Sequence, residues 1–306
     1  INFLSCCKGK SHYQKLAQHD LIGFTPFFYL MSTRVAYLGP KGTYAEKAAK
    51  SLAALEKIDS PKFSPCKGLR SVVDNLANNL CEAAVVPIEN SVEGGVTSTL
   101  DSLWRHKNLF IHRALVLPIK HSLMSCGSIS TISEVLSHPQ AIAQCSQWLN
   151  DNLPNAVHLP TNSTAEAIRM VKGSSFRAAI GSKDASEDLN ILAYPINDIE
   201  GNCTRFILLS KNDIKEDGNK ASFAFSLKSN SPGALLEALN CIANLGLNMS
   251  RIESRPSKRE LGEYVFFIDL DLNISNKKDF EKVKDKLSPL CNQIINFGCY
   301  FGSEIN

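Results

Sequence analysis

Short apolar runs and amphipathic segments alternate along most of the chain, and this alternation predicts an α/β fold. From residue 34 to about residue 211, strands or extended segments are expected at 35–38, 83–88, 109–117, 121–126, 157–159, 178–180, 191–196 and 206–209. Helices are expected at 97–104, 132–136 and 141–153, and directly after Thr43 and Ser163. Strands that alternate with helices commonly build parallel sheets, so mostly parallel sheets are expected here.

Two of the expected helices begin with a capping box, in which a hydroxyl and a glutamate three positions later bond to free backbone donors. Thr43 is followed by Glu46, and Ser163 is followed by Glu166. Gly173 is expected to end the second of these helices.

The order of elements changes after residues 212–220, a polar segment that we interpret as a linker. Strands are then expected at 222–227, 248–254, 264–270 and 294–300, and helices at 232–245 and 278–287. Ser231 is the expected N-cap of the first helix. The resulting βαββαβ order is the ferredoxin-like arrangement. The chain is therefore divided into an N-terminal extension at 1–33, an α/β region at 34–211, the linker, and a smaller domain at 221–302.

Composition and charge narrow the classes of function. The chain has 306 residues, of which 44% are hydrophobic and 21% charged, as in an ordinary globular protein, and its net charge is only +3. Without a basic block or an apolar run of about 18 residues, neither a nucleic-acid partner nor a membrane span is expected. Ten cysteines without Cys-x-x-Cys spacing favour reduced thiols in a cytoplasmic protein, with neither a disulfide framework nor a zinc site.

Candidate chemistry lies in five polar turns beside helix starts, at 39–43, 87–95, 137–144, 162–165 and 202–206. The N-terminus of a helix presents free N–H groups and a partial positive charge, so several together suit a small polycarboxylate. The glycine spacings of a P-loop or a dinucleotide fingerprint are absent from the sequence, which argues against a nucleotide cofactor.

The same segments resemble the prephenate dehydratase family. The matching motifs are GPKGTYAEKAA, PIENSVEGGV, SHPQAIAQC, NSTAEA and NCTRF, and the second region resembles an ACT regulatory domain through SPGALLEAL and ESRP. The resemblance runs in order from about residue 34 to 302. It implies a catalytic region of two α/β lobes, arranged like a type II periplasmic binding protein, followed by a ferredoxin-like ACT domain.

The resemblance also implies an activity, the loss of water and carbon dioxide from prephenate to give phenylpyruvate in phenylalanine biosynthesis. It implies no metal and no organic cofactor. A chorismate mutase domain precedes the dehydratase in some family members; about 33 residues precede it here, so a monofunctional enzyme is expected. Two alternatives stay open: an arogenate dehydratase that makes phenylalanine directly, and a non-catalytic sensor of amino acids or small acids.

The roles of individual residues also follow from the resemblance. The Thr204 hydroxyl is expected to polarise the leaving oxygen, and Arg205 to clamp a substrate carboxylate or, alternatively, to form an ion pair at the lobe interface. Glu89 relays a proton or orients its neighbours, and Asn90 donates to a carboxylate. Further substrate-binding residues are expected to be Thr43, Ser91, Gln144, Ser163, Thr164, Asn202 and Phe206, of which Thr43, Ser163 and Thr164 are also helix caps and Phe206 is also core. His138 is interpreted as a cap rather than a proton carrier.

The family binds phenylalanine between two ACT domains, so the resemblance implies allosteric control by L-phenylalanine and at least a homodimer, or a homotetramer. The expected effector residues are Asn230, Ser231, Gly233, Ala234, Leu235, Leu236, Asn248, Glu253, Ser254 and Arg255. Without that role, Arg255 is an ordinary solvated charge.

Overall fold

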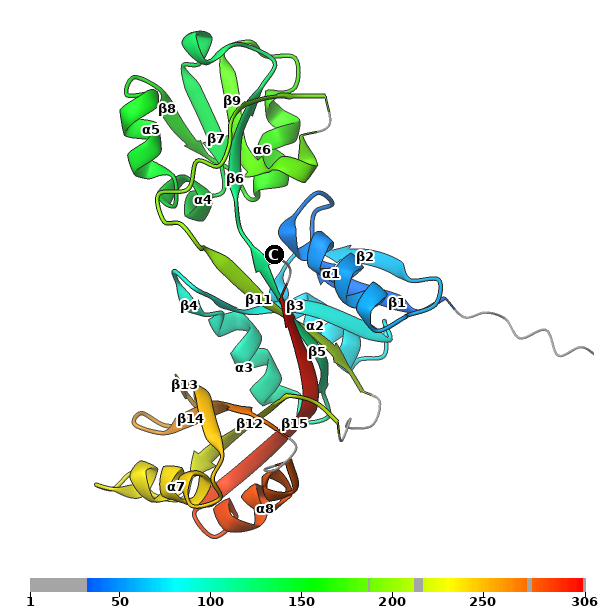
Figure 1. Ribbon diagram of the computed structural model, residues 1–306, viewed down its shortest axis with the longest axis vertical. Helices are drawn as coiled ribbons and strands as arrows, with labels where there is room; N and C mark the ends of the chain where they lie inside the picture. Colours follow the sequence, from blue (N-terminus) through cyan, green and yellow to red (C-terminus); the bar gives the residue numbers. More distant parts are fainter. Residues whose placement is uncertain (1–31, 187, 212–216, 274–276, 305–306) are drawn as a thin grey trace, which may run out of the picture. The chain divides into compact units, whose positions relative to one another are not determined.

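The computed structural model describes residues 32–304 except 187, 212–216 and 274–276 (Figure 1). The predicted extension therefore lies outside the described residues apart from 32 and 33, as do residues 212–216 of the predicted linker. In the described part the strands form two sheets. No helix of that part is long and apolar enough to cross a membrane.

The larger sheet runs in the order β13-β14-β12-β15-β5-β11-β3-β1-β2, and β4 pairs with β3 at its side. Its strands are β1 (Arg34–Leu38), β2 (Lys62–Cys66), β3 (Ala83–Asn90), β4 (Gly94–Gly95), β5 (Phe110–Pro118), β11 (Cys203–Ser210), β12 (Lys220–Leu227), β13 (Asn248–Pro256), β14 (Tyr264–Asp271) and β15 (Cys291–Glu304). The helices that follow these strands are α1 (Tyr44–Leu55), α2 (Leu69–Ala77), α3 (Thr97–Arg105), α7 (Ala234–Ala243) and α8 (Lys277–Leu287).

The smaller sheet runs in the order β10-β6-β9-β7-β8. It contains β6 (His121–Ser125), β7 (Glu134–Ser137), β8 (Val157–Pro160), β9 (Arg177–Ser182) and β10 (Asn190–Ala193), with helices α4 (Pro139–Ala143), α5 (Ser146–Asn152) and α6 (Thr164–Val171). The chain passes from the first sheet to the second between β5 and β6 and returns between β10 and β11, so these segments join two α/β lobes.

Helix α1 shows why the sequence folds as it does in the first lobe. Ala45, Ala48, Ala49 and Leu52 recur at helical spacing and are buried against β1, β3, β5 and β11. The predicted capping hydroxyl is confirmed, because Thr43 Oγ1 accepts from the backbone N–H of residue 46 at 3.3 Å. The glutamate of this box bonds one residue earlier than expected, at the N–H of residue 42 (2.6 Å).

The expectation of mostly parallel sheets is wrong. In the α/β region, β11 is antiparallel to both β3 and β5, and β6 is antiparallel to both β9 and β10. The parallel pairs are β1 with β2 and β3, and β7 with β8 and β9. The mixed pairing arises because β6 and β11, the strands that follow the two crossings between the lobes, run antiparallel to the strands on both sides of them.

Two helix predictions in the second lobe also need correction. Residues 132–136 were expected to be helical, but most of this stretch belongs to strand β7, which lies between β8 and β9. Val135 and Leu136 are both buried because helices cover both faces of this sheet, and in a stretch of only five residues the pattern of apolar positions does not distinguish a strand from a helix. The helix expected at 141–153 is two helices, α4 and α5.

The C-terminal region has the predicted βαββαβ order, β12–α7–β13–β14–α8–β15. Helix α7 begins at Ala234, and its N-cap is Gly233 with a φ of 86°, so the expectation that Ser231 caps this helix is wrong. Strand β15 does not stop at residue 300: Phe301–Glu304 pairs in parallel with β5. One strand thus belongs to both regions, and the sheet is continuous across the expected domain boundary.

Candidate active site

A cavity of about 520 Å³ has walls from both lobes. All five polar turns singled out in the sequence contribute to it. Its lining includes Thr43, Asn90, Thr204 and Phe206 from the first lobe and His121, His138, Gln144, Ser163 and Thr164 from the second. The starts of α1 and α6 are both on this wall, so free backbone N–H groups and the positive ends of two helix dipoles face the cavity. This volume is in the range typical of pockets for small molecules.

The Thr204 hydroxyl is oriented by Asn90, whose Nδ2 donates to Thr204 Oγ1 at 3.0 Å. Asn90 Oδ1 accepts from the backbone N–H groups of Val92 (3.0 Å) and Glu93 (3.1 Å), so the carboxamide can point only one way. Because Thr204 Oγ1 receives a hydrogen from Asn90, the hydroxyl keeps its own hydrogen to donate to a group in the cavity.

The polar network continues to the second lobe. Asn202 Oδ1 accepts from the Asn90 carboxamide (2.9 Å), and Asn202 Nδ2 donates to Gln144 Oε1 (3.0 Å). Gln144 Nε2 donates to Glu93 Oε1 at 2.9 Å, which leaves Gln144 Oε1 as the acceptor that faces His121 Nε2 at 3.1 Å. His121 Nε2 therefore carries a proton. This chain of carboxamides ties the two lobes together beside the Thr204 hydroxyl.

Strand alternation separates Thr204 from Arg205. Successive side chains of a strand point to opposite faces, and Thr204 and Phe206 line the cavity whereas Arg205 does not. Glu89, which is opposite Arg205 in the β3–β11 pairing, is also absent from the cavity wall. The expectation that Arg205 clamps a substrate carboxylate is therefore corrected. Phe206 both lines the cavity and packs in the core of the first lobe.

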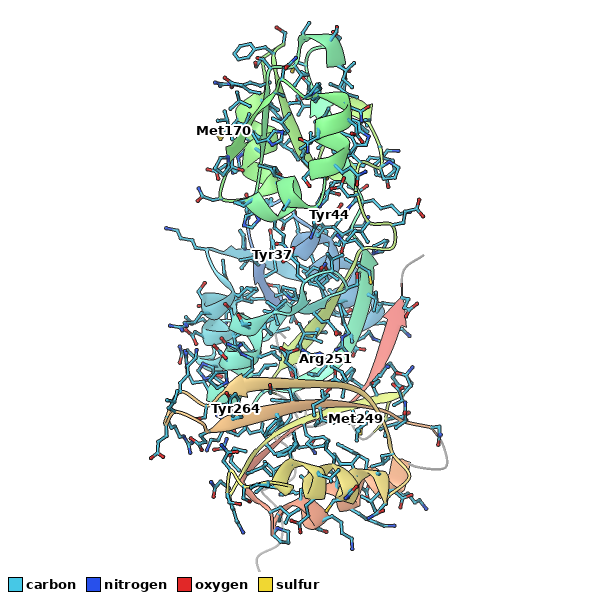
Figure 2. All side chains as sticks on the ribbon, turned by 90° about the vertical axis from the view of Figure 1, so that its left-hand side faces the viewer. Tyr37, Tyr44, Met170, Met249, Arg251 and Tyr264 are labelled. Carbon is cyan, nitrogen blue, oxygen red and sulfur yellow. The ribbon has the colours of Figure 1, made fainter. Side chains whose placement is uncertain are left out.

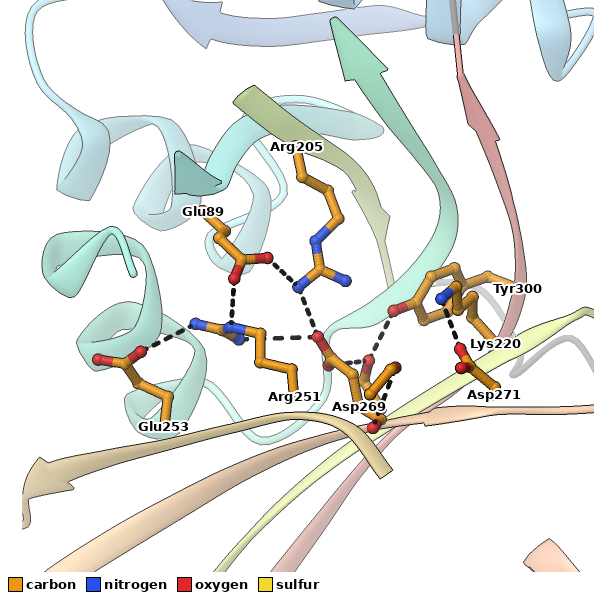
Figure 3. Close-up of polar contacts among 10 residues, drawn as sticks. Glu89, Arg205, Lys220, Arg251, Glu253, Asp269, Asp271 and Tyr300 are labelled. Carbon is orange, nitrogen blue, oxygen red and sulfur yellow. Dashed lines mark hydrogen bonds and ion pairs between the residues drawn. The ribbon is translucent and has the colours of Figure 1, made fainter. Parts of the chain in front are cut away.

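Arg205 instead joins a group of charges at the C-terminal region, which we call the Arg205 cluster: Glu89, Arg205, Arg251, Glu253 and Asp269 (Figure 3). Arg205 Nη2 lies 2.6 Å from Asp269 Oδ2 and 2.8 Å from Glu89 Oε2. Arg251 projects from β13 (Figure 2), with Nε 3.5 Å from Glu89 Oε1 and Nη1 3.7 Å from Asp269 Oδ2. The alternative interpretation of Arg205 as an ion-pair residue is the one that the structure supports, but the pairs join β11 to β3 and to β14 of the C-terminal region and not to the second lobe as expected.

Burial and the charge of Asp269 together determine the protonation states of Arg205 and of the neighbouring Tyr300. Burial is the largest single effect and opposes the charge on Arg205, but the attraction of Asp269, its hydrogen bond and the other charges nearby together outweigh burial and raise the pKa of Arg205. Burial, followed by the charge of Asp269, raises the pKa of Tyr300, whose hydroxyl is 2.7 Å from the Ser222 hydroxyl. Ser222 in turn donates to Asp269 Oδ1 at 2.6 Å. At neutral pH, Arg205 is therefore a cation and Tyr300 a neutral phenol.

The remaining predicted substrate residues divide into two groups. Thr43, Ser163 and Thr164 line the cavity, and the hydroxyls of Thr43 and Ser163 also cap α1 and α6. Ser91 is not on the wall: its Oγ accepts from the backbone N–H of Cys203 at 2.9 Å and so attaches the turn after β3 to β11. Asn202 is buried within the carboxamide network and is likewise absent from the wall.

Tyr44, Lys67 and His121 are among the wall residues that the sequence analysis did not name as site residues. The Tyr44 hydroxyl donates to the carbonyl of Lys120 at 2.6 Å, which connects α1 to the second lobe. In the sequence, His121 is a polar residue at the start of an expected strand. The structure shows that this strand is buried throughout.

The predicted effector residues form two groups. Asn230, Ser231 and Gly233 to Leu236 lie before α7 and in its first turn, and Asn248, Glu253, Ser254 and Arg255 lie on β13, the edge strand of the larger sheet. Arg255 is not a solvated charge, because its Nε lies 3.3 Å from Asp101 Oδ1 on α3. A Cβ atom at Gly95 would lie 2.7 Å from Glu253 Oε2, so β13 approaches the turn after Asn90 closely.

Comparisons with known proteins agree with this geometry. The family described as prephenate dehydratase matches residues 35–214. The chain is 39% identical over 265 residues to a prephenate dehydratase of Methanocaldococcus jannaschii, covering 84% of this chain and 94% of that protein. It is 38% identical over 261 residues to a bifunctional chorismate mutase/prephenate dehydratase of Aquifex aeolicus, covering 84% of this chain and 69% of that protein.

Two solved structures are similar in fold. Prephenate dehydratase from Arthrobacter aurescens in complex with L-Phe superposes with a TM-score of 0.78 at 33% identity, covering 88% of this chain and 90% of that chain. The enzyme from Staphylococcus aureus superposes with a TM-score of 0.75 at 28% identity, covering 88% and 100%. Given the match over residues 35–214 and relatives of similar length at close to 40% identity, the chain belongs to the prephenate dehydratase family.

Proposed function

We propose that this chain converts prephenate to phenylpyruvate, and that the cavity between the lobes is where it does so. The observation that carries the assignment of the site is the Thr204 hydroxyl on the cavity wall, with Asn90 donating to its oxygen. In the reaction the bond between the ring and its carboxylate breaks, and its electron pair completes the aromatic ring. The ring hydroxyl leaves with the electron pair of the C–O bond and takes up one proton to become water. The Thr204 hydrogen is available to bond to that oxygen.

The substrate is a dianion, and the cavity offers complementary groups. The N-terminal turns of α1 and α6 face it with Thr43 and Ser163 as caps, and Lys67 adds a cation at the wall. Helix N-termini bind carboxylates through backbone N–H groups and the helix dipole. These contacts hold the substrate, and Thr204 acts on the leaving oxygen.

The test is replacement of Thr204 by valine, which keeps the shape and removes the hydroxyl, with Thr204→Ser as the matched control. Loss of a group that assists proton transfer typically lowers the rate by about 10²–10⁴. We expect kcat to fall by that factor in Thr204→Val while Thr204→Ser keeps most of its activity, measured as phenylpyruvate formation from prephenate. Turnover by Thr204→Val close to wild type would contradict the assignment. Arogenate assayed alongside would show by its kcat/KM whether it is the preferred substrate, and a chain inert to both would be a sensor.

We also propose that residues 221–302 are an ACT domain that binds L-phenylalanine as an allosteric effector. The βαββαβ order and the strand order β13-β14-β12-β15 support this, as does the similarity to the Arthrobacter aurescens prephenate dehydratase, which was solved in complex with L-Phe. Saturating phenylalanine should lower activity and raise Tm, because a ligand of the native state at 100 times its Kd stabilises it by about 2.7 kcal/mol. An unchanged Tm would refute phenylalanine binding.

The proposed oligomer is a homodimer, or a homotetramer, that forms through the ACT domains. Strand β13 lies at the edge of the sheet, and the apolar side chains of Ile252 on β13 and Leu236 on α7 are 42% and 62% exposed. An edge strand with exposed apolar neighbours is suited to pairing with a second copy. Sedimentation equilibrium should give at least twice the mass of one chain.

The proposed organisation is a bilobed catalytic region at 34–211, like a type II periplasmic binding protein, followed by the linker and the ACT domain. Two sheets joined by two crossings, with the cavity walled by both, support it. We place the enzyme in the cytoplasm, since the cysteines described at positions 66–291 are free thiols, as a reducing compartment maintains them.

A further inference from the structure

His121 has an unusual position at the start of β6. Its side chain is 3% exposed and lines the cavity. The Nε2 proton is donated to Gln144 Oε1 at 3.1 Å, and Gln144 is itself oriented by Glu93. Nδ1 is buried and has no hydrogen-bond partner in the part of the chain that the structure describes. Buried polar atoms are almost always paired, so an unpaired ring nitrogen on a cavity wall points to a ligand as its partner.

Because Nε2 carries a fixed proton, Nδ1 is the atom of His121 that changes its state. In the neutral ring Nδ1 bears a lone pair, and in the protonated ring it bears a hydrogen that it can give away. The hydrogen bond from Nε2 to Gln144 is present in both states. The ring can therefore gain and lose a proton at Nδ1 without moving.

The proposed reaction consumes one proton, because the hydroxyl must leave as water. Within the described residues, five titratable side chains line the cavity: Tyr44, Lys67, Glu93, His121 and His138. The Tyr44 hydroxyl is bonded to a backbone carbonyl, and burial raises its pKa. The Glu93 carboxylate accepts from Gln144.

The other two candidates are also less suitable proton donors. Lys67 is exposed, so its ammonium is hydrated by solvent. His138 Nδ1 accepts from the backbone N–H of Gln140 at 3.3 Å and caps α4, which leaves only its Nε2. The imidazole of His121, in contrast, is buried. Its Nε2 is held by Gln144, and its Nδ1 bonds to no group of the described residues.

We propose that His121 is a catalytic residue whose protonated Nδ1 contacts the leaving hydroxyl of the substrate and converts it to water. This inference rests on the proposed function. As the C–O bond breaks, its electron pair stays on oxygen, the Nδ1–H bond breaks, and an O–H bond forms. The carboxylate leaves as carbon dioxide, its former bonding pair enters the ring, and the neutral imidazole regains a proton from solvent. Thr204 donates a hydrogen bond to the same oxygen.

The surroundings of His121 suit this cycle. Burial lowers its pKa, although the bond to Gln144 acts in the opposite direction, so the ring in the free enzyme favours the neutral state. The ring of Tyr44 on α1 packs against the His121 ring in a T-shaped arrangement, with ring centroids 6.1 Å apart. Glu93 contacts the opposite end of the Gln144 carboxamide. A bound dianion favours the protonated ring, because opposite charges at close range favour the charged form. The substrate would thus recruit the proton that its reaction consumes.

The test compares His121→Asn and His121→Gln with His138→Asn as the matched control. The Asn carboxamide reaches the position of Nδ1, and that of Gln reaches the position of Nε2. All variants are assayed with prephenate from pH 5.5 to 9, with spontaneous breakdown subtracted and folding checked by circular dichroism and Tm. Wild-type kcat should fall tenfold per pH unit on the alkaline side of the profile.

We expect His121→Asn to keep a KM near wild type, because its carboxamide still contacts the substrate, while kcat falls about 10²–10⁴ and the alkaline limb disappears. His121→Gln should lose kcat equally, although it keeps the contact to Gln144. His138→Asn should keep the alkaline limb, whatever its effect on KM. If His121→Gln kept the kcat and the alkaline limb of the wild type, His121 would only position Gln144 and the proposal would be overturned. Loss of the alkaline limb in His138→Asn would also overturn it.

A measurement on the unmodified enzyme covers variants that do not fold. ¹⁵N spectra of the histidine rings should show His121 as the neutral Nε2–H tautomer in the free enzyme, and an Nδ1–H tautomer would overturn the proposal. Failure of the proposed function is a separate result, because wild-type protein would then form no phenylpyruvate from prephenate at any pH.

Discussion

Replacement of Arg205 by methionine tests whether this buried cation holds the C-terminal region rather than the substrate. The Arg205 cluster contains two cations and three carboxylates, so its formal charge is 2 − 3 = −1. Arg205→Met makes it −2 and leaves Asp269, whose side chain is 3% exposed, with Arg251 at 3.7 Å as its remaining cation. Removal of one partner from a buried ion pair costs about 3–5 kcal/mol. The Glu89 side chain is 37% exposed, so the loss of its contact adds little.

The reciprocal change should be milder. Asp269→Asn brings the formal charge to zero and leaves Arg205 with Glu89 at 2.8 Å, so a loss of about 1–3 kcal/mol is expected. The double variant should lose less than the sum of the two single variants, because each one already breaks the same contact. A coupling energy of about 1 kcal/mol or more would identify the Arg205–Asp269 pair, at 2.6 Å, as the contact that stabilises the fold.

The assay is urea denaturation at pH 7 followed by circular dichroism, together with KM for prephenate. Arg34→Met is the control, because the Arg34–Glu82 pair has a similar N–O distance of 2.7 Å but both side chains are 49% exposed, and such pairs contribute about 0–1 kcal/mol. We expect KM of Arg205→Met to stay near wild type. A loss of stability below about 1 kcal/mol, combined with a KM raised tenfold or more, would refute the reasoning and restore Arg205 as a substrate clamp.

Three further predictions concern local contacts. Burial raises the pKa of Glu46, but bonds from the Gly42 N–H and a lysine outweigh burial and lower the pKa in the fold, so the contribution of Glu46 to stability is present at neutral pH and lost in acid. In urea titrations Glu46→Gln should be about 0.5–1 kcal/mol less stable than wild type at pH 7, and the difference should disappear as the pH falls through the lowered pKa of Glu46. Gly233→Ala should cost about 1 kcal/mol, because φ is 86° there although no atom lies within 4 Å of the added Cβ, and an equal Tm would contradict this. Asp101→Asn should weaken inhibition by phenylalanine several-fold in dose–response curves, because Asp101 joins α3 to Arg255 on the proposed effector strand; unchanged inhibition would exclude this contact from the coupling.

Predictions from the sequence succeeded where the cause is local. The capping hydroxyls of Thr43 and Ser163 act within one helical turn, and the apolar spacing in α1 needs only the helix period. The βαββαβ order follows from alternation and turn residues over short stretches. The five polar turns were recognised because their hydroxyl and amide side chains lie beside helix starts, where free N–H groups favour an anion, and all five reach one cavity.

Features that depend on distant partners were decided only by the tertiary structure. Residues 132–136 are mainly a strand because β8 and β9 pair on both sides of them, which the residue pattern of so short a stretch does not reveal. Arg205 adjoins Thr204 in the sequence, yet its direction follows from the strand period and its partner Asp269 lies 64 positions away. The extension of β15 onto β5 and the unpaired Nδ1 of His121 likewise exist only once the sheets have formed. Local propensity determines which elements form, whereas pairing between elements determines which face of each strand meets the cavity, because the free energy of a buried charge or an unpaired nitrogen depends on groups that only folding brings near.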